Sequence, residues 1–286
     1  MLLRNLRITL GMIKFEHSVF ALPFALTGAV LAARGWPQPR QVFWIVVAMV
    51  GARSAAMSFN RLADWRMDAA NPRTSARALP AGLLSRRFVA QFTFLSAALL
   101  VLAAHQLNAL CFALSPAVLA ILFFYSYTKR FTVLSHLILG FCLGLAPAAA
   151  WIAVRGRLDP PILLLSAAVM LWTAGFDIIY ACQDLEFDRR AGLFSLPRRV
   201  GIGRALGIST RMHALMLALL AALAMLERLG WVSLAGLAVV AALLIYEHSL
   251  VKPHDLSRVN AAFFTVNGYI SVLFFAFWAA AVLLRR

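Results

Sequence analysis

The stretch from Thr132 to Val154, TVLSHLILGFCLGLAPAAAWIAV, decides the fold class because it contains no Asp, Glu, Lys or Arg. The apolar core of a bilayer is about 30 Å thick, and a helix needs about 20 mostly apolar residues to cross it. Similar runs recur along the chain. They predict nine transmembrane helices, at residues 16–34, 41–60, 87–105, 108–126, 132–154, 161–181, 210–228, 231–250 and 260–284. The predicted fold class is therefore all-α, a polytopic membrane bundle forming a single intramembrane domain over residues 1–286.

The composition fits a chain whose surroundings are the lipid bilayer. Hydrophobic residues make up 63% of the 286 residues, and charged residues make up only 13%. The mean hydropathy is +0.83. Soluble domains are ordinarily about half apolar and about one quarter charged, so the composition excludes an ordinary soluble protein.

The net charge of +16 does not indicate a nucleic-acid partner. The basic residues lie between the apolar runs, and no nucleic-acid motif accompanies them. With the N-terminus in the cytoplasm, most of them fall on the cytoplasmic side, as the positive-inside rule requires. The sequence thus predicts a multi-pass protein of the cytoplasmic (inner) membrane, whose first residues form an interfacial amphipathic helix.

Two long predicted loops, 61–86 and 182–209, both face the cytoplasm in this topology and resemble each other. Residues 60–80 read NRLADWRMDAANPRTSARALP, and residues 180–197 read YACQDLEFDRRAGLFSLP. Each segment has an Asp-x-x-x-Asp pair, then basic residues, then Leu-Pro. The likeness predicts a weak internal duplication with two similar Asp-rich sites.

The Asp pairs stand out because the whole chain has only 11 acidic residues. Asp64 and Asp68 are four residues apart and share one face of a helix, as do Asp184 and Asp188. Carboxylates this close repel each other unless a cation lies between them. Mg²⁺ prefers oxygen ligands, typically one or two carboxylates completed by phosphates and water, and the Asn60 amide oxygen lies on the same face as the first pair. The sequence predicts two Mg²⁺-diphosphate sites.

Basic residues near the Asp pairs are candidates for binding the diphosphate, since guanidinium groups match phosphate oxygens. They are Arg73 and Arg77 after the first pair and Arg198 after the second. Lys129, with Tyr125 four residues before it, ends a predicted span on the same side. Topology charges explain the arginines equally well, and a Lys that extends its amine to the interface explains Lys129.

Ionisable residues inside apolar runs form a further set of candidates, because charge in a membrane is costly. Asp177 lies within a predicted span. Glu16 and His17 lie where the first predicted span begins. A histidine hydrogen-bonded at the interface is the plainer interpretation of His17, whereas the depth of Asp177 favours a function.

These motifs resemble the UbiA family of intramembrane prenyltransferases over essentially the whole chain. Asn60, Asp64 and Asp68 are similar to the family's N-D-x-x-D-x-x-x-D motif, and Asp184 and Asp188 are similar to its D-x-x-x-D motif. Tyr125 and Lys129 match its Y-x-x-x-K. One residue departs from the pattern: position 61 is Arg, where many members have Asp.

The resemblance implies Mg²⁺-dependent transfer of a polyprenyl chain from polyprenyl diphosphate to an aromatic acid. The branch it resembles is 4-hydroxybenzoate polyprenyltransferase-like and includes members of menaquinone synthesis, so another quinone precursor is an alternative acceptor. The implied metal ligands are Asn60, Asp64, Asp68, Asp184 and Asp188. Tyr125 is then expected to shield the allylic cation, and Asp177, Glu186 and His17 are the candidate acceptor-binding residues.

Two other classes of protein use comparable residues. A transporter also carries intramembrane carboxylates and internal repeats, but it places them near the bilayer midplane, whereas these Asp pairs fall at the cytoplasmic ends of predicted spans. A CDP-alcohol phosphotransferase also binds Mg²⁺ through Asp clusters, but it needs a denser Gly and Asp pattern within one segment.

Overall fold

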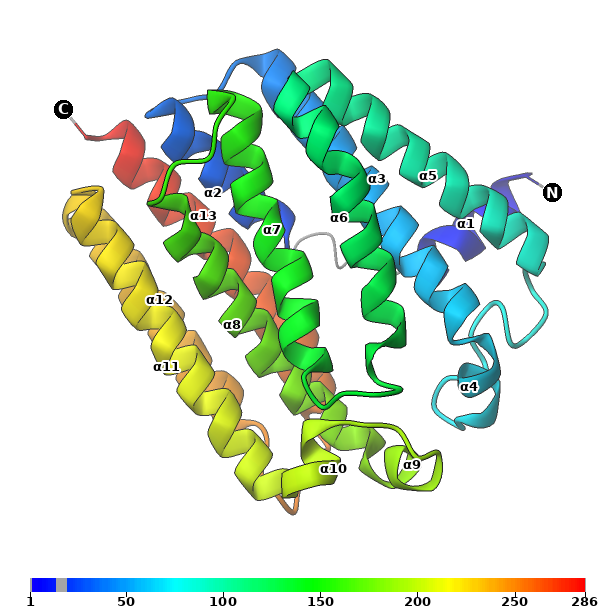
Figure 1. Ribbon diagram of the computed structural model, residues 1–286. Helices are drawn as coiled ribbons and strands as arrows, with labels where there is room; N and C mark the ends of the chain where they lie inside the picture. Colours follow the sequence, from blue (N-terminus) through cyan, green and yellow to red (C-terminus); the bar gives the residue numbers. More distant parts are fainter. Residues whose placement is uncertain (1, 14–19, 286) are drawn as a thin grey trace. The chain divides into compact units, whose positions relative to one another are not determined.

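The computed structural model describes residues 2–13 and 20–285, and its regular elements are helices (Figure 1). In chain order they are α1 Leu2–Met12, α2 Leu22–Ala33, α3 Pro39–Ala63, α4 Trp65–Ala70, α5 Arg86–Leu107, α6 Ala109–Thr128, α7 Ser135–Arg155, α8 Ile162–Ala181, η2 Cys182–Asp184, α9 Leu185–Arg190, α10 Leu196–Val200, α11 Ile202–Leu226, α12 Gly230–Ser249, η3 Ala261–Val266 and α13 Asn267–Leu283. The predicted all-α class is confirmed, and the predicted N-terminal helix is present as α1.

Eight helical stretches among the described residues are long and apolar enough to cross a membrane. They correspond to the predicted spans from the second to the ninth. The first predicted span is represented by α2, an apolar helix of 12 residues. The count of nine spans and the cytoplasmic N-terminus stay predictions.

The segment predicted as a loop at 182–209 is largely helical, so its predicted boundaries were wrong. The stretch that begins with α8 remains helical through η2 and α9 to Arg190. At the other end α11 begins at Ile202 rather than at 210. The prediction ended each span where charges begin, but a helix whose backbone hydrogen bonds are satisfied internally continues beyond the apolar core.

The chain divides into two compact units. The first consists of Met1–Ser18 and Phe43–Tyr127 and carries the first Asp pair. The second consists of Val19–Val42 and Thr128–Arg286 and carries the second pair. The prediction of one domain over 1–286 stays a prediction.

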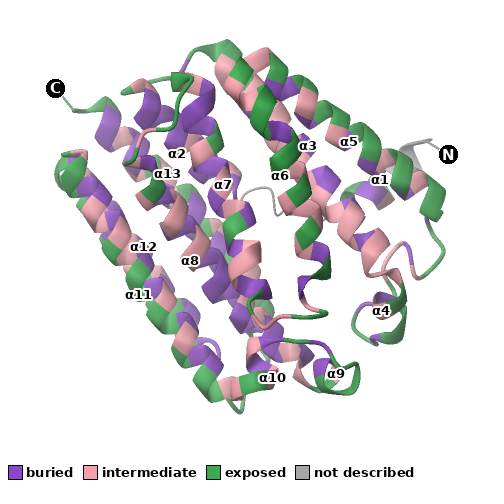
Figure 2. Ribbon diagram, viewed as in Figure 1, coloured by how far each residue is buried: buried purple, intermediate pink, exposed green. Residues whose placement is uncertain are grey.

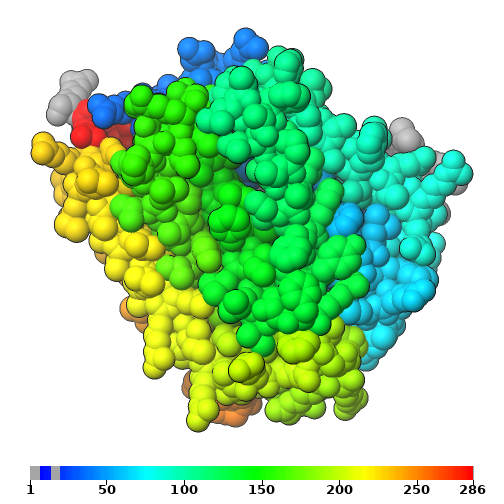
Figure 3. All heavy atoms as spheres, in the orientation of Figure 1, coloured from blue at the N-terminus to red at the C-terminus, as the bar shows by residue number. Residues whose placement is uncertain are grey.

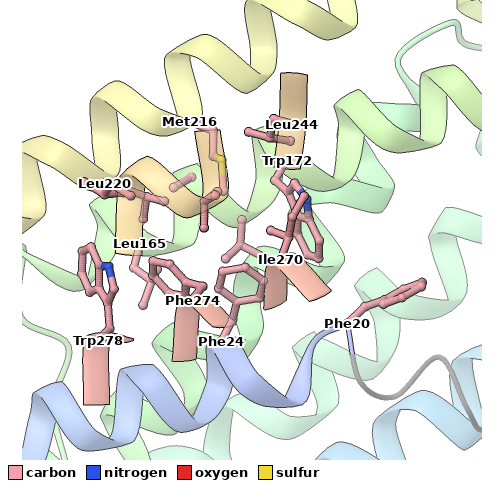
Figure 4. Packing of buried hydrophobic residues seen from close by; sticks show 14 of the residues in the cluster. Phe20, Phe24, Leu165, Trp172, Met216, Leu220, Leu244, Ile270, Phe274 and Trp278 are labelled. Carbon is pink, nitrogen blue, oxygen red and sulfur yellow. The ribbon is translucent and has the colours of Figure 1, made fainter. Parts of the chain in front are cut away.

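Aromatic side chains form the centre of the second unit (Figure 4). The Phe24 ring lies 4.9 Å from the ring of Trp172 on α8 and 4.9 Å from that of Phe274 on α13. Phe274 in turn lies 4.7 Å from Trp278. Offset aromatic pairs at these distances add to the stabilisation from burial, so this stack fixes α2, α8 and α13 against one another.

Small residues set the contact between α7 and α8. Gly140 and Gly144 are four residues apart on α7, and a Cβ at either position would come within 2.2 Å of the Met170 carbonyl oxygen or 2.6 Å of that of Ser166. Small residues at this spacing let two membrane helices approach closely, where lipid offers no hydrophobic driving force. The contact holds the start of α7 against the end of α8, where several candidate site residues lie.

In the first unit, α3 packs on α5 through Gly51, where a Cβ would lie 2.8 Å from the Leu100 nitrogen. The same two helices are also joined by a hydrogen bond, in which the Thr93 hydroxyl of α5 donates to the Ser58 hydroxyl of α3 at 2.8 Å. A small apolar cluster joins α1 to the segment before α5; its buried members are Met12, Ile13, Leu79, Leu84 and Val89. These contacts position the end of α3, from which the first Asp pair extends.

Burial differs strongly between helices (Figure 2). In the span that begins with α8, 61% of the apolar window is buried, against 11% for α6. The exposed side chains of α6 include Phe112, Leu114 and Phe124. In the space-filling view, side chains occupy the space between the ribbons of α7, α11 and α12 (Figure 3). Exposed apolar faces on closely packed helices are those of a protein surrounded by lipid.

Candidate active site

The two Asp pairs have the same backbone. Asp64 (φ −95°, ψ 5°) precedes the six-residue helix α4, and Asp184 (φ −93°, ψ 4°) precedes the six-residue helix α9. In each case the second Asp, Asp68 or Asp188, is buried within the short helix. The likeness of the two sequence segments thus extends to their local conformation. We call Asn60–Asp68 the first motif and Asp184–Asp188 the second motif.

Within the first motif the predicted helical spacing is present. The Asp64 amide donates to the Asn60 carbonyl at 2.9 Å, and the Asp68 amide donates to the Asp64 carbonyl at 2.7 Å. The Asn60 side-chain nitrogen donates to Asp64 Oδ2 at 2.9 Å. Asn60 and Asp64 therefore share a face, as the four-residue spacing predicts.

Both carboxylate oxygens of Asp68 accept hydrogen bonds from arginines. Arg61 Nη1 lies 3.2 Å from Oδ2, and Arg77 Nη1 lies 2.7 Å from Oδ1. The Thr74 hydroxyl donates to the Asp68 carbonyl at 2.9 Å, which fixes the following turn. In this structure the negative charge of Asp68 is neutralised by the chain itself.

Arg61 is the central residue of this arrangement. Its side chain is 9% exposed, and its Nη2 donates to Asn60 Oδ1 at 2.9 Å. The amide oxygen predicted to bind a metal therefore faces a guanidinium. The metal-binding roles of Asn60 and Asp68 stay predictions, and the structure adds Arg61 as a competitor for both.

Two further predicted residues, Arg73 and Tyr125, belong to the first unit. Arg73 is exposed, and Tyr125 is half-buried near the end of α6. Asn60 Nδ2 also lies 3.4 Å from the Ser126 hydroxyl, next to Tyr125 in the chain. The diphosphate-binding roles of Arg73 and Arg77 and the shielding role of Tyr125 stay predictions.

The second motif has the opposite electrostatic state. The Asp188 side chain is 1% exposed, and Lys129 Nζ lies 3.9 Å from its Oδ1. The Ser195 hydroxyl is also a neighbour, yet neither Asp188 oxygen has a hydrogen-bond partner among the residues that the structure describes. Asp184 is buried as well, with 7% exposure.

The second motif fits a divalent cation. Burying a carboxylate without hydrogen bonds is costly, because even an uncharged polar group costs about 2 to 7 kcal/mol and a charged group costs more. Hard cations prefer such oxygens. Within the described ranges no group of three or more His, Cys, Asp or Glu side chains is arranged to hold a metal ion. An ion here would therefore complete its coordination with phosphate oxygens and water.

Asp177, the predicted intramembrane carboxylate, is held by a residue that the sequence analysis missed. His136 Nδ1 lies 2.7 Å from Asp177 Oδ2, and His136 Nε2 accepts from the Leu196 amide at 3.4 Å. With Nε2 as the acceptor, the proton of a neutral ring sits on Nδ1 and points to the carboxylate. The sequence feature that could have identified it is a histidine within an apolar run, because any ionisable residue in a membrane-spanning segment indicates a functional site, as an Asp does.

The remaining predicted residues of the second unit have local partners. Arg198 Nη1 donates to the Leu193 carbonyl at 2.5 Å, and Glu186 is exposed and pairs with Arg189 at 3.0 Å. The Phe194 amide donates to the Lys129 carbonyl at 2.8 Å, which ties the turn after α9 to Lys129 within the same unit. His17 lies outside the described residues. The substrate roles of Arg198, Glu186 and His17 stay predictions.

A second buried polar group, also missed from the sequence, lies deeper in the second unit. Asn267 Nδ2 donates to Glu247 Oε1 at 2.8 Å, and the Trp172 indole donates to Asn267 Oδ1 at 2.7 Å. Nδ2 of Asn267 also lies 3.1 Å from the Ala262 carbonyl. The group thereby stabilises the π-helical turn η3, where the carbonyls lack the usual helical partners.

Comparison with known proteins gives one consistent family. Residues 21–283 match the UbiA prenyltransferase family. The 4-hydroxybenzoate octaprenyltransferase of Vibrio atlanticus (strain LGP32) is 30% identical over 258 residues, which cover 88% of this chain and 90% of that protein. The protein of the same name from Vibrio cholerae (strain M66-2) is 31% identical over 249 residues, covering 86% of each.

Solved structures show the same fold. An apo structure of a UbiA homolog from Aeropyrum pernix K1 superposes with a TM-score of 0.84 at 35% identity, covering 92% of this chain and 96% of that one. A UbiA homolog from Archaeoglobus fulgidus bound to GPP and Mg²⁺ has a TM-score of 0.71 at 23% identity, covering 96% and 99%. The family match over residues 21–283 includes both motifs and every helix after α1.

Proposed function

Because the chain belongs to the UbiA prenyltransferase family, we propose that it transfers a polyprenyl chain from polyprenyl diphosphate to an aromatic acid of the 4-hydroxybenzoate type. The family membership makes it a multi-pass membrane prenyltransferase. Two 4-hydroxybenzoate octaprenyltransferases, at 30% and 31% identity, support the acceptor class. The observation in the structure that carries the proposal is the buried Asp188 carboxylate, which has no hydrogen-bond partner among the described residues and has Lys129 at 3.9 Å.

The second motif is proposed to bind the diphosphate end of the donor together with Mg²⁺. Asp184 and Asp188 supply carboxylate oxygens to the ion, and Lys129 donates to a phosphate oxygen. When bound, Mg²⁺ supplies positive charge that stabilises the departing diphosphate. Asp64 of the first motif, with Arg73 and Arg77 after it in the chain, is likewise proposed to bind diphosphate.

The proposed reaction exchanges one bond for another. The allylic C1–O bond breaks, and its electron pair leaves with the diphosphate. A ring carbon ortho to the phenol hydroxyl attacks C1 and forms the new C–C bond, after which the ring loses a proton to solvent or to a carboxylate. Tyr125 is proposed to shield the developing allylic cation, because an aromatic face attracts positive charge.

Asp177 is proposed to position the acceptor. His136 fixes the orientation of its carboxylate, so that the oxygen not bound to the ring accepts from the phenol hydroxyl of the acid. Such an orienting partner commonly changes the activity of a site by about 10- to 100-fold. The proposed location is the cytoplasmic side of the inner membrane, supported by the excess of Lys and Arg near both motifs.

The test uses the full chain, purified in lipid nanodiscs. With Mg²⁺, octaprenyl diphosphate and 4-hydroxybenzoate, the expected product is the prenylated acid, detected by its mass, and EDTA is expected to abolish it. Geranyl diphosphate tests whether a short donor is accepted. Absence of product with 4-hydroxybenzoate and with other phenolic acids would overturn the proposal. Product with another phenolic acid alone would overturn the acceptor class and leave prenyl transfer standing.

A further inference from the structure

Arg61 occupies a place in the first motif that has no counterpart in the second. Its guanidinium bridges Asn60 Oδ1 at 2.9 Å and Asp68 Oδ2 at 3.2 Å, and only 9% of its side chain is exposed. Arg61 lies three residues before Asp64, and the position three residues before Asp184 in the second motif is Ala181, which carries no charge. The second motif thus has no buried cation of its own on the preceding turn.

We infer that Arg61 is a positioning residue that serves as the resident cation of the first motif, holding Asn60 and Asp68 where a divalent ion would otherwise be needed to neutralise them. The inference rests on the proposed function, because it concerns the metal requirement of that site. As a consequence, the second motif binds a divalent ion in the absence of substrate, whereas the first motif does not.

Geometry and charge favour this assignment. A guanidinium is planar and permanently charged, and it presents several donors in a fixed fork that matches an amide oxygen and a carboxylate at once. Asp68 has Arg77 on its other oxygen at 2.7 Å, so a divalent ion at either oxygen would lie next to a guanidinium or displace it. Cations crowded around one carboxylate repel one another. The first motif is therefore a poor resting metal site despite its spacing.

The experiment counts bound metal without turnover. Mn²⁺ serves as the paramagnetic stand-in for Mg²⁺, and the loss of its free-ion EPR signal is titrated against the full chain in nanodiscs, without diphosphate. We expect one Mn²⁺ per wild-type chain. This equivalent should disappear in Asp188→Asn and persist in Asp64→Asn and Asp68→Asn. Loss of the resting equivalent in Asp68→Asn would overturn the inference, and so would a wild-type count of two.

Arginine substitutions test the resident cation directly. Arg61→Asn should add a second Mn²⁺ equivalent, and the double variant Arg61→Asn/Asp68→Asn should lose it again. Arg61→Lys keeps the positive charge and should stay at one equivalent. The matched control is Arg87→Asn, which removes the same charge from an exposed position on α5, outside the motif, and should also stay at one. An unchanged count in a folded Arg61→Asn variant would overturn the inference.

The two proposals fail differently in this design. If the same preparations form no prenylated acid, the proposed function fails whatever the Mn²⁺ count is. If product forms but the count is the same in wild type and Arg61→Asn, only the role of Arg61 fails. Where Arg61→Asn does not fold, the counts in wild type, Asp68→Asn and Asp188→Asn still decide the question, because the substitutions to Asn preserve side-chain shape.

Discussion

Asp68 and Asp188 hold equivalent positions in two motifs with the same backbone, yet their carboxylates meet different surroundings. Asp68 accepts from two arginines, at 3.2 and 2.7 Å. Asp188 is more deeply buried and has an ammonium at 3.9 Å, with no hydrogen bond to either oxygen among the described residues. The comparison teaches that carboxylate spacing alone does not define a metal site, because the residues around each carboxylate decide whether a cation is still needed.

The difference follows from where the basic residues stand. In the first unit Arg61 lies three residues before Asp64, and its guanidinium contacts both Asn60 and Asp68. In the second unit the basic residues of α9 are exposed, as in the Arg189 pair with Glu186, and so do not neutralise the buried carboxylate. In the first motif, arginines of the chain neutralise Asp68, whereas in the second motif Asp188 has no hydrogen bond from the described residues and can accept a cation.

Asp188→Asn should have the largest effect on activity. It keeps the shape of the side chain but removes the charge that binds the ion, and loss of one such electrostatic contact typically costs about 10²- to 10³-fold in turnover. We expect prenyl transfer to fall by about 10³-fold, measured as product mass per unit time at saturating Mg²⁺. Asp255→Asn, which removes an exposed carboxylate outside both motifs, is the control and should keep wild-type turnover. Turnover of Asp188→Asn within tenfold of wild type would contradict the metal role.

Asp68→Asn should lower stability, whereas Asp188→Asn should not. Asp68→Asn leaves Arg61 buried without its carboxylate, and breaking a buried ion pair costs about 3 kcal/mol. Asp188→Asn removes a buried charge that lacks hydrogen bonds, so it should leave stability unchanged or raise it. Thermal unfolding of both variants in metal-free detergent solution measures the two shifts. Equal destabilisation by both would show that the two carboxylates have the same surroundings.

Lys129→Gln should separate donor binding from metal binding. The ammonium at 3.9 Å competes with a divalent ion for Asp188, so its removal should raise the affinity for Mn²⁺ in the absence of substrate. The same change removes a charge-assisted donor to phosphate, so the KM for polyprenyl diphosphate should rise by about tenfold. Lys129→Arg should restore most of the donor affinity. A fall in both affinities in Lys129→Gln would show that Lys129 supports the motif structurally instead.

The sequence predicted the helices and both motifs well, for physical reasons. Apolar runs long enough to cross a bilayer are hard to explain otherwise, and a four-residue spacing places side chains on one face whatever surrounds the helix. The extent of the second loop was wrong because charge marks the membrane boundary rather than the end of a helix, as the early start of α11 at Ile202 shows.

The residues that contact the motif side chains could not be predicted from the sequence. Arg61 was visible as a departure from the family pattern, but its contacts with Asn60 and Asp68 depend on which way a long side chain turns. His136 and Asp177 are 41 residues apart, and only the packing of α7 on α8 brings them together. Pairwise contacts of this kind arise from tertiary structure, which spacing along one chain segment does not encode.

His136→Gln should have the smallest effect of the series and tests whether the second motif extends to Asp177. The amide can still donate to Asp177 but lacks the ring that also accepts from the Leu196 amide, so the carboxylate loses its fixed orientation. We expect kcat to fall by about tenfold, as is usual for orienting partners, with the KM for the aromatic acid raised and the KM for the diphosphate unchanged. His254→Gln, at an exposed position, is the control. A rise in the diphosphate KM instead would place His136 with the Asp188 site, because the second motif would then depend on the segment that His136 anchors.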